Sequence, residues 1–107
     1  MFIIMENEIY LHRLDKDSVE NIAELFRALG DPTRFRIISA LIDREFNVGE
    51  LAQITGISES AASHQLRTLR QLRLVKTRKQ GREVFYTLDD DHVTDLVKRA
   101  IFHILHE

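Results

Sequence analysis

The chain of 107 residues has no cysteine, one proline and four glycines, and it contains no long hydrophobic run. The absence of cysteine excludes disulfide bonds and metal sites built on thiolates. No apolar stretch approaches the roughly 18 residues of a membrane-spanning helix. Residues 1–5 are apolar, but the segment is too short for a signal peptide and lacks a basic flank. We therefore expect a cytoplasmic protein with no membrane partner.

Motifs for enzymatic chemistry are also missing. The sequence has no glycine-rich phosphate-binding loop and no nucleophile motif. Charged residues make up 30% and hydrophobic residues 44% of the chain, which is ordinary for a globular protein. There is no repeat, low-complexity segment or linker. The length therefore suits a single domain, residues 1–107, with a modest core.

Positive charge is concentrated in one part of a chain whose net charge is −2. Residues 60–82 contain no acidic residue and seven basic ones: Arg67, Arg70, Arg73, Lys76, Arg78, Lys79 and Arg82. The other eight basic residues and all 17 acidic residues lie elsewhere. A basic segment in an otherwise acidic protein is typical of a surface that binds a nucleic-acid backbone. A solvated basic face is the alternative, and charge alone does not decide between them.

Hydrophobic periodicity and capping residues predict helices in the first half of the chain. Residues 17–29 form the first helix, with Asp17 or Ser18 as its N-cap. Asp31 and Pro32 start the second helix, whose broad apolar surface indicates a buried central position. Residues 1–16 are left as an N-terminal arm.

The next two predicted helices form a helix-turn-helix, residues 47–72. The third helix begins at Asn47 or Val48 and stops at Gly56, and the fourth runs from Glu59 to about Leu72. A short turn with glycine, followed by a helix with a polar and basic outer face, is typical of this DNA-binding motif.

A hairpin and one more helix complete the chain. Two strands, residues 74–79 and 82–88, are predicted around Gln80 and Gly81, and a hairpin in this position is a wing, residues 74–88. The last helix, residues 90–106, carries an apolar stripe wide enough to face both the domain and a partner. The fold class is therefore mainly α with a small β-hairpin, a winged helix-turn-helix of order α-α-α-α-β-β-α.

Four residues at the two ends of the last helix are potential metal ligands: Asp90, His92, His103 and His106. His103 lies eleven positions after His92, which is roughly 16 Å along a helix, so the two pairs cannot share a metal within one chain. Eleven steps leave a rotation of only about 20°, so both pairs lie on one face. Two antiparallel copies about a twofold axis would form two equivalent four-ligand sites. In the alternative interpretation, Asp90 is only an N-cap and the histidines are surface residues.

Several segments resemble those of one regulator family. They are FRALGDPTR at 26–34, SHQLR at 63–67, LRLV at 72–75, GREVFY at 81–86 and the terminal ligand set. Through them, nearly the whole chain resembles the ArsR/SmtB family of winged-helix metal-sensing repressors. The resemblance implies a twofold dimer formed by helices 17–29 and 90–106. It also implies a fourth helix that enters the DNA major groove, and release of operator DNA when metal binds.

The resemblance also narrows the choice of metal. The family's thiolate site for arsenic, cadmium or lead lies at the stretch matching 47–51, and this chain has no cysteine there. The family's site on the last helix has the pattern Asp-x-His, a second His eleven positions after the first, and His-x-x-His from there, and the four ligands match it position by position. Zinc- and cobalt-responsive members use this site, and three nitrogens with one oxygen suit tetrahedral zinc. Nickel members recruit further ligands, and His12 is a weaker candidate for one. Asp89 and Asp91 are weaker candidates for the zinc site, and Glu107 is expected at most beside a ligand and not on the metal.

The predicted DNA contacts fall into two groups. Base contacts are expected from the early part of the fourth helix: Ser58, Ser60, Ala61, Ser63, His64 and Gln65. Among them Gln65 is the best-equipped base reader, because its amide can pair bidentately with adenine. Phosphate contacts are expected from Arg67, Arg78, Lys79 and Arg82. In relatives with this metal site a ligating histidine hydrogen-bonds the helix near His64, which is therefore expected on the path that couples metal to DNA.

The expected function is a metal-responsive repressor whose apo dimer binds double-stranded operator DNA. Two Zn²⁺ per dimer, or Co²⁺ and less favourably Ni²⁺, would release it and derepress metal efflux or homeostasis genes. In the alternative, the metal is structural, or the inducer is nickel or a non-metal signal. A zinc hydrolase is disfavoured because a catalytic zinc keeps an open position, whereas four protein ligands close it. Acid should weaken metal binding and restore repression, because the ligating histidines must be neutral.

Overall fold

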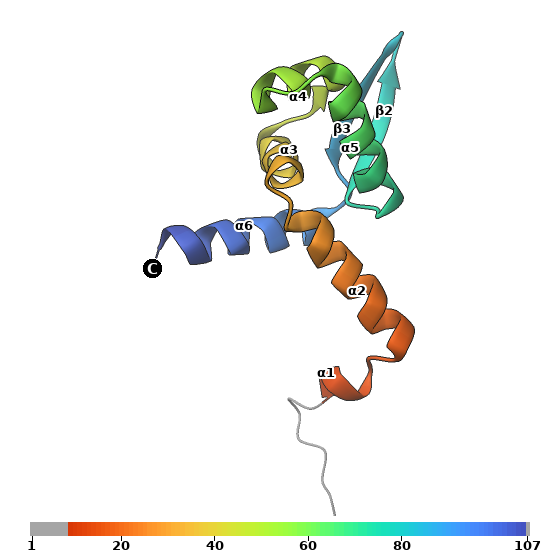
Figure 1. The fold of residues 1–107 in the computed structure, drawn as a ribbon, viewed down its shortest axis with the longest axis vertical. Coiled ribbons are helices and arrows are strands. Elements are labelled where there is room, and N and C mark those ends of the chain that lie inside the picture. Colours follow the sequence, from red (N-terminus) through yellow and green to blue (C-terminus); the bar gives the residue numbers. More distant parts are fainter. Residues whose placement is uncertain (1–8, 107) are drawn as a thin grey trace, which may run out of the picture.

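The computed structural model describes residues 9–106, and Figure 1 shows their arrangement. The elements follow in this order: α1 (Ile9–His12), α2 (Lys16–Leu29), α3 (Pro32–Asp43), β1 (Phe46–Asn47), α4 (Val48–Thr55), α5 (Glu59–Gln71), β2 (Val75–Gln80), β3 (Glu83–Leu88) and α6 (Asp91–Leu105). This is the predicted winged helix-turn-helix, with two additions that the sequence did not reveal, α1 and β1. Residues 1–8 of the expected N-terminal arm and Glu107 lie outside the described residues.

The start of α2 differs from the prediction. Asp15, and not Asp17 or Ser18, is the N-cap: it has an extended backbone, and its carboxylate accepts a hydrogen bond from the Ser18 backbone N–H at 2.7 Å. An N-cap side chain bonds the N–H three residues ahead, and Asp15 meets this condition. The helix therefore begins at Lys16. The next helix starts as predicted, with Asp31 as N-cap and Pro32 at its first position.

The helix-turn-helix is built by local capping. Asn47 and Glu50 form a capping box at the start of α4, each side chain bonding the other's backbone N–H. Gly56 ends α4 with a φ of 73°, a left-handed conformation that glycine adopts without steric cost. Ser58 then caps α5, its hydroxyl accepting from the Ala61 N–H at 3.0 Å. The two helices of the motif therefore span Val48–Thr55 and Glu59–Gln71.

The wing is part of a three-stranded antiparallel sheet of order β1-β3-β2. The hairpin turn is Gly81-Arg82, one residue later than predicted, because Gln80 pairs with Glu83. Gly81 has a φ of 62°, which suits the first position of a two-residue hairpin turn. The short strand β1 joins through Phe46, which pairs with Tyr86. A side-chain hydrogen bond of 3.2 Å from Asn47 to Glu83 ties the start of α4 to the wing.

The core lies between α3, α4, α5 and the sheet, and its most deeply buried side chains are Ile37, Ile38, Leu51, Leu66, Leu69, Leu74, Val75 and Val97. The prediction that the second helix is central is confirmed, since Ile37 and Ile38 are fully buried. In Figure 1, α2 and α6 extend away from this core in different directions. Within residues 9–106, none of the helices has the length and apolar character needed to cross a membrane.

Candidate functional site

Helix α5 presents an exposed polar face. Ser60, Ser63, His64 and Arg67 are all exposed, and their spacing of three and four residues places them on one side of the helix. The opposite side is anchored in the core by Ala62, Leu66 and Leu69. A reading helix needs this division between a fixed apolar side and a free polar side.

Two of the predicted base contacts are not on this face. Gln65 follows Ser60 by five residues, a rotation of about 140°, so it points toward the packed side of α5. It is half-buried, and its side-chain oxygen accepts a hydrogen bond of 3.1 Å from Arg34 on α3. Ala61 is half-buried as well. In this structure the Gln65 amide oxygen, which was expected to accept from adenine, accepts from Arg34 instead.

The wing tip carries two exposed basic residues, Lys79 and Arg82. The third predicted phosphate contact, Arg78, is exposed but already engaged. Its guanidinium donates to both carboxylate oxygens of Glu45 and to the side chain of Gln80, and it lies 4.9 Å from the ring centroid of Phe85. These hydrogen bonds hold the pKa of the Glu45 carboxyl below its usual value. Arg78 therefore braces the wing against the segment that precedes β1.

The first pair of potential metal ligands lies at the start of α6. Asp90 is its N-cap, with Oδ1 accepting from the Val93 N–H at 3.0 Å. This backbone hydrogen bond is the main reason that the pKa of Asp90 is lowered. The Nδ1 atom of His92 lies 3.5 Å from Oδ1 of Asp90, and the His92 side chain is almost fully exposed. Since a carboxylate has two oxygens, capping and metal ligation by Asp90 are compatible.

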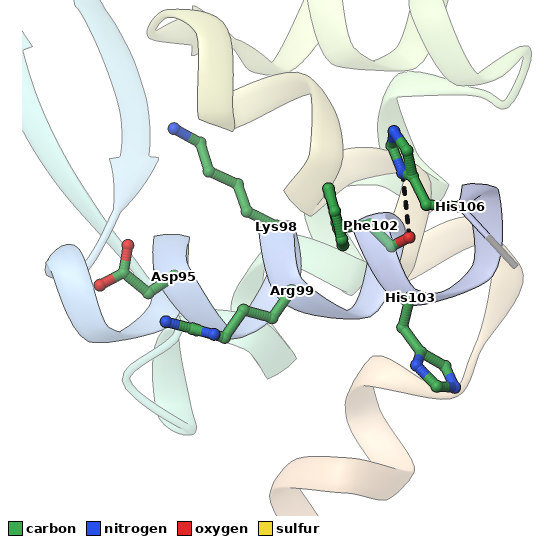
Figure 2. A pocket seen from close by; sticks show the side chains of 6 residues that line it. All are labelled: Asp95, Lys98, Arg99, Phe102, His103 and His106. Atoms are coloured by element: carbon green, nitrogen blue, oxygen red, sulfur yellow. Dashed lines mark hydrogen bonds between the residues drawn. The ribbon is translucent and has the colours of Figure 1, made fainter.

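The second pair lies at the other end of α6, around an open hollow shown in Figure 2. His103 and His106 both line this hollow, together with Asp95, Lys98, Arg99 and Phe102. The ring of His106 stacks on Phe102, and its Nδ1 lies 3.1 Å from the Phe102 carbonyl oxygen. Because a carbonyl only accepts, this contact requires the proton on Nδ1, and in that neutral tautomer Nε2 holds the lone pair that a metal needs.

Within residues 9–106, no group of three or more ligating side chains comes together in one chain. Each end of α6 supplies two ligands, and a closed tetrahedral site needs four. A carboxylate and three imidazoles fit zinc or cobalt(II) if two chains share each site. The contact of His106 with the Phe102 carbonyl oxygen also favours the tautomer that can bind a metal.

Three residues with clear roles in this geometry were missed or left without a role by sequence reasoning: Arg34, Glu45 and Phe102. The partners of Arg34 and Glu45 lie 31 and 33 residues away in the chain. Pairings at such separation leave no periodic signal. Phe102 precedes His106 by four residues, and the spacing of helix neighbours is the one signal that indicates this contact.

The fold and the exposed face of α5 define a DNA-binding winged helix-turn-helix protein. Residues 31–77 match the family described as bacterial regulatory protein, arsR family. A transcriptional repressor, the SmtB homolog of Synechocystis, is 49% identical over 88 residues, covering 82% of this chain and 67% of the relative. The chain belongs to the ArsR family, as the sequence resemblance predicted.

Two further relatives show the range of this similarity. The transcriptional activator HlyU of Vibrio cholerae is 36% identical over 96 residues, covering 90% of this chain and 83% of HlyU. Its structure matches with a TM-score of 0.76 at 33% identity, over 88% of this chain and 100% of that one. A homodimeric winged helix-turn-helix DNA-binding domain from Mycobacterium bovis, a possible ArsR-family regulator, matches with a TM-score of 0.76. Its identity is 26%, over 89% of this chain and 94% of that one. HlyU is named a transcriptional activator, and the M. bovis domain is described as a possible transcriptional regulator.

Proposed function

We propose that the chain is a metal-responsive transcriptional repressor. Its apo homodimer binds operator DNA, and zinc or cobalt at two sites between the α6 helices of the dimer releases it. Genes of metal efflux or homeostasis are then derepressed. The observation that carries the proposal is the placement of two ligand pairs, Asp90 with His92 and His103 with His106, at opposite ends of α6.

Exposed apolar side chains on the two projecting helices support a homodimer. Phe26 on α2 is 55% exposed, and Phe102 and Leu105 on α6 are 62% and 72% exposed. An apolar groove of about 410 Å³ also lies open between Phe35 of α3 and Ile101 of α6. Contiguous apolar surface on a small protein marks an interaction site, and the M. bovis relative is homodimeric. A second copy would cover both helices, and an antiparallel pair of α6 helices would unite the ligand pairs.

Base and phosphate contacts to DNA are assigned by exposure and charge. Ser60, Ser63 and His64 would meet base edges in the major groove, while Arg67 would meet phosphate. Ser58 at the N-terminus of α5 and the wing residues Lys79 and Arg82 would position the domain on the backbone. Two α5 helices related by a twofold axis would read half-sites about one helical turn apart.

Metal release requires that zinc bind the DNA-free geometry of the dimer more tightly than the DNA-bound geometry. A thousandfold loss of operator affinity corresponds to about 4 kcal/mol of coupling. By reciprocity, operator DNA must weaken zinc binding by the same factor. Clamping the α6 helices together supplies such a difference, because it fixes the relative orientation of the two domains and hence of their α5 helices.

The test is fluorescence anisotropy of a duplex from the protein's own promoter, titrated with zinc. The wild type should bind the duplex without metal and leave it as zinc is added, whereas His103→Ala should stay bound. His12→Ala is the matched control, since it removes a histidine from α1, and it should respond like the wild type. Cobalt(II) added to the wild type should give the absorption of a tetrahedral site. If His103→Ala responds to zinc like the wild type, the α6 site is not the sensor.

A second candidate is a winged-helix regulator in which the metal is structural or the signal is nickel or a non-metal compound. The 36% identity to HlyU supports this candidate, because HlyU is a relative whose name, transcriptional activator, mentions no metal. Asp90 would then serve α6 only as its N-cap. In this case zinc would bind without changing the anisotropy of the duplex.

A further inference from the structure

The side chain of Arg34 joins three helices at one point. Its Nε donates to the Ala28 carbonyl at 2.9 Å, and its Nη2 reaches the Arg27 carbonyl at 3.5 Å. Both carbonyls are in the last turn of α2, where backbone acceptors have no partner within the helix. The remaining nitrogen, Nη1, donates to Oε1 of Gln65 on α5 at 3.1 Å. One planar guanidinium thus connects the end of α2, the start of α3 and the middle of α5.

The hydrogen bond between Arg34 and Gln65 differs in kind from the other contacts of α5. Among residues 9–106, the bond to Gln65 is the one side-chain hydrogen bond between α5 and another helix. The rest of the packing of α5 is apolar and is directed mainly at α4 and β2. Apolar packing is non-directional, whereas a charge-assisted hydrogen bond sets orientation and is roughly twice as strong as a neutral one.

Arg34 is itself held in place at both ends. Its backbone N–H is bonded to the Asp31 carboxylate at 2.9 Å, in the N-terminal capping interaction of α3. Its side chain is half-buried, so fewer water molecules can compete for the hydrogen bonds of the guanidinium. Gln65 therefore meets a donor whose position is fixed by contacts with α2 and α3.

We propose that Arg34 is a positioning residue for DNA recognition, which holds α5 at a fixed orientation to α2 through Gln65. In this proposal the role of Gln65 is to accept the hydrogen bond from Arg34, and not to contact a base. The proposal rests on the proposed function, in that α5 reads DNA and α2 belongs to the dimer interface. Reorienting α5 affects contacts with base edges, which need exact geometry, more than contacts with phosphates, which are sequence-independent. The affected quantity is therefore the ratio of specific to non-specific affinity.

The experiment begins with a random-sequence duplex library selected on the wild-type homodimer. The recovered duplex and a scrambled duplex of equal length are then titrated with each variant by fluorescence anisotropy at one salt concentration. Gln65→Met removes the acceptor but keeps the three bonds that Arg34 makes to α2 and Asp31. It should lower the ratio of the two affinities by about tenfold. Gln65→Glu keeps the acceptor and should retain the ratio, even though its charge weakens both affinities.

Arg34→Lys completes the comparison, with the exposed Arg36→Lys on the same helix as the control. Arg34→Lys should lower the ratio of specific to non-specific affinity as Gln65→Met does. In the double variant Arg34→Lys/Gln65→Met the ratio should fall no further than in the more affected single variant. Arg36→Lys should leave the ratio unchanged. An unchanged ratio in Gln65→Met overturns the proposal. So does a loss in both Gln65→Met and Gln65→Glu with none in Arg34→Lys, which would make Gln65 a direct base reader. If Arg34→Lys does not fold, the two Gln65 variants decide. If the wild type recovers no common sequence, the proposed function fails instead.

Discussion

The imidazole of His106 lies nearly parallel to the ring of Phe102, with centroids 4.0 Å apart and planes 16° apart. The same residue's carbonyl oxygen accepts from Nδ1 of His106. Phe102 thus holds the imidazole both by its ring and by its backbone, and Nε2 is left on the side away from that carbonyl (Figure 2). A ligand that is already oriented loses less freedom when it binds a metal.

Replacing Phe102 should therefore weaken metal binding without removing a ligand. Phe102→Ala deletes the stacked ring, and we expect zinc affinity to fall by about tenfold, as for other residues that orient a ligand. Competition with a chromophoric chelator measures the affinity. Phe102→Tyr keeps an aromatic ring at this position and is the matched control. Equal affinities of Phe102→Ala and the wild type would show that the stack does not contribute.

Local chemistry made most of the fold predictable. Asp31, Ser58 and the left-handed Gly56 cap helices through contacts within four residues of the chain. A short segment of sequence therefore contains everything needed to predict them. The strand β1 was missed because two residues carry no periodicity, and its formation depends on Tyr86, forty positions after Phe46.

The site was less predictable because several contacts are non-local. The apolar set Ala62, Leu66 and Leu69 marks the packed side of α5 and could have placed Gln65 beside it. Its partner Arg34 has no such signal, because α3 and α5 meet only in the folded chain. The ligand pairs on α6 could be proposed from spacing, since both lie on one helix, but a shared site needs a second copy of the chain.

Asp90 has two assigned roles that can be separated by substitution. Asparagine is as good an N-cap as aspartate but is a weaker metal ligand, whereas alanine serves neither role. Asp90→Asn should keep the thermal midpoint of the apo protein and lose at least tenfold in zinc affinity. Asp90→Ala should lose both. Calorimetric unfolding without metal and zinc titration distinguish the variants, and full zinc affinity in Asp90→Asn would leave Asp90 with the capping role alone.

The ion pair between Glu45 and Arg78 should give the wing a pH dependence. Arg78 holds the pKa of Glu45 below its ordinary value of 4.5, so the pair stabilises the fold above about pH 4.5. That contribution is lost as the pH falls through the lower, folded pKa. Glu45→Gln should therefore have a lower urea midpoint than the wild type at pH 7, and the difference should shrink below pH 4.5. Glu20→Gln, an exposed charge change on α2, should show no such convergence.

The wing tip can be tested through salt dependence. If Lys79 and Arg82 each neutralise one phosphate, Lys79→Ala and Arg82→Ala should each reduce the slope of log affinity against log salt by about one. Lys16→Ala, at the start of α2, removes an exposed charge far from the wing and should leave the slope unchanged. Arg78→Ala should change the slope less than either wing-tip variant, because Arg78 is occupied by Glu45. Slopes equal to the wild type for Lys79→Ala and Arg82→Ala would place the wing off the DNA.

The proposed metal sites also fix how two α6 helices must align. If His92 of one protomer meets His103 of the other, the twofold axis crosses α6 midway between them, next to Lys98. Asp95 and Arg99 line the same hollow as His103 and His106, and they lie on opposite sides of that axis. Asp95 of one protomer then falls within about one residue of the partner's Arg99, twice per dimer. Opposite charges in this arrangement attract, and a reversed charge repels.

Arg99→Glu should therefore raise the dimer dissociation constant by about tenfold at low salt, and Asp95→Lys/Arg99→Glu should restore it. Arg36→Glu makes the same charge change on an exposed position of α3 and should leave the constant unaltered. Sedimentation equilibrium of the metal-free protein gives all four constants. Asp95 and Arg99 are also i,i+4 neighbours within α6, so the double variant restores that contact as well. Mixing the Asp95→Lys and Arg99→Glu proteins separates the two contacts, because only antiparallel helices about this axis make the mixed dimer tighter than either single-variant homodimer. Failure of the double variant to recover, with the single variant impaired, would mean that α6 pairs in another register and that the two ligand pairs do not meet.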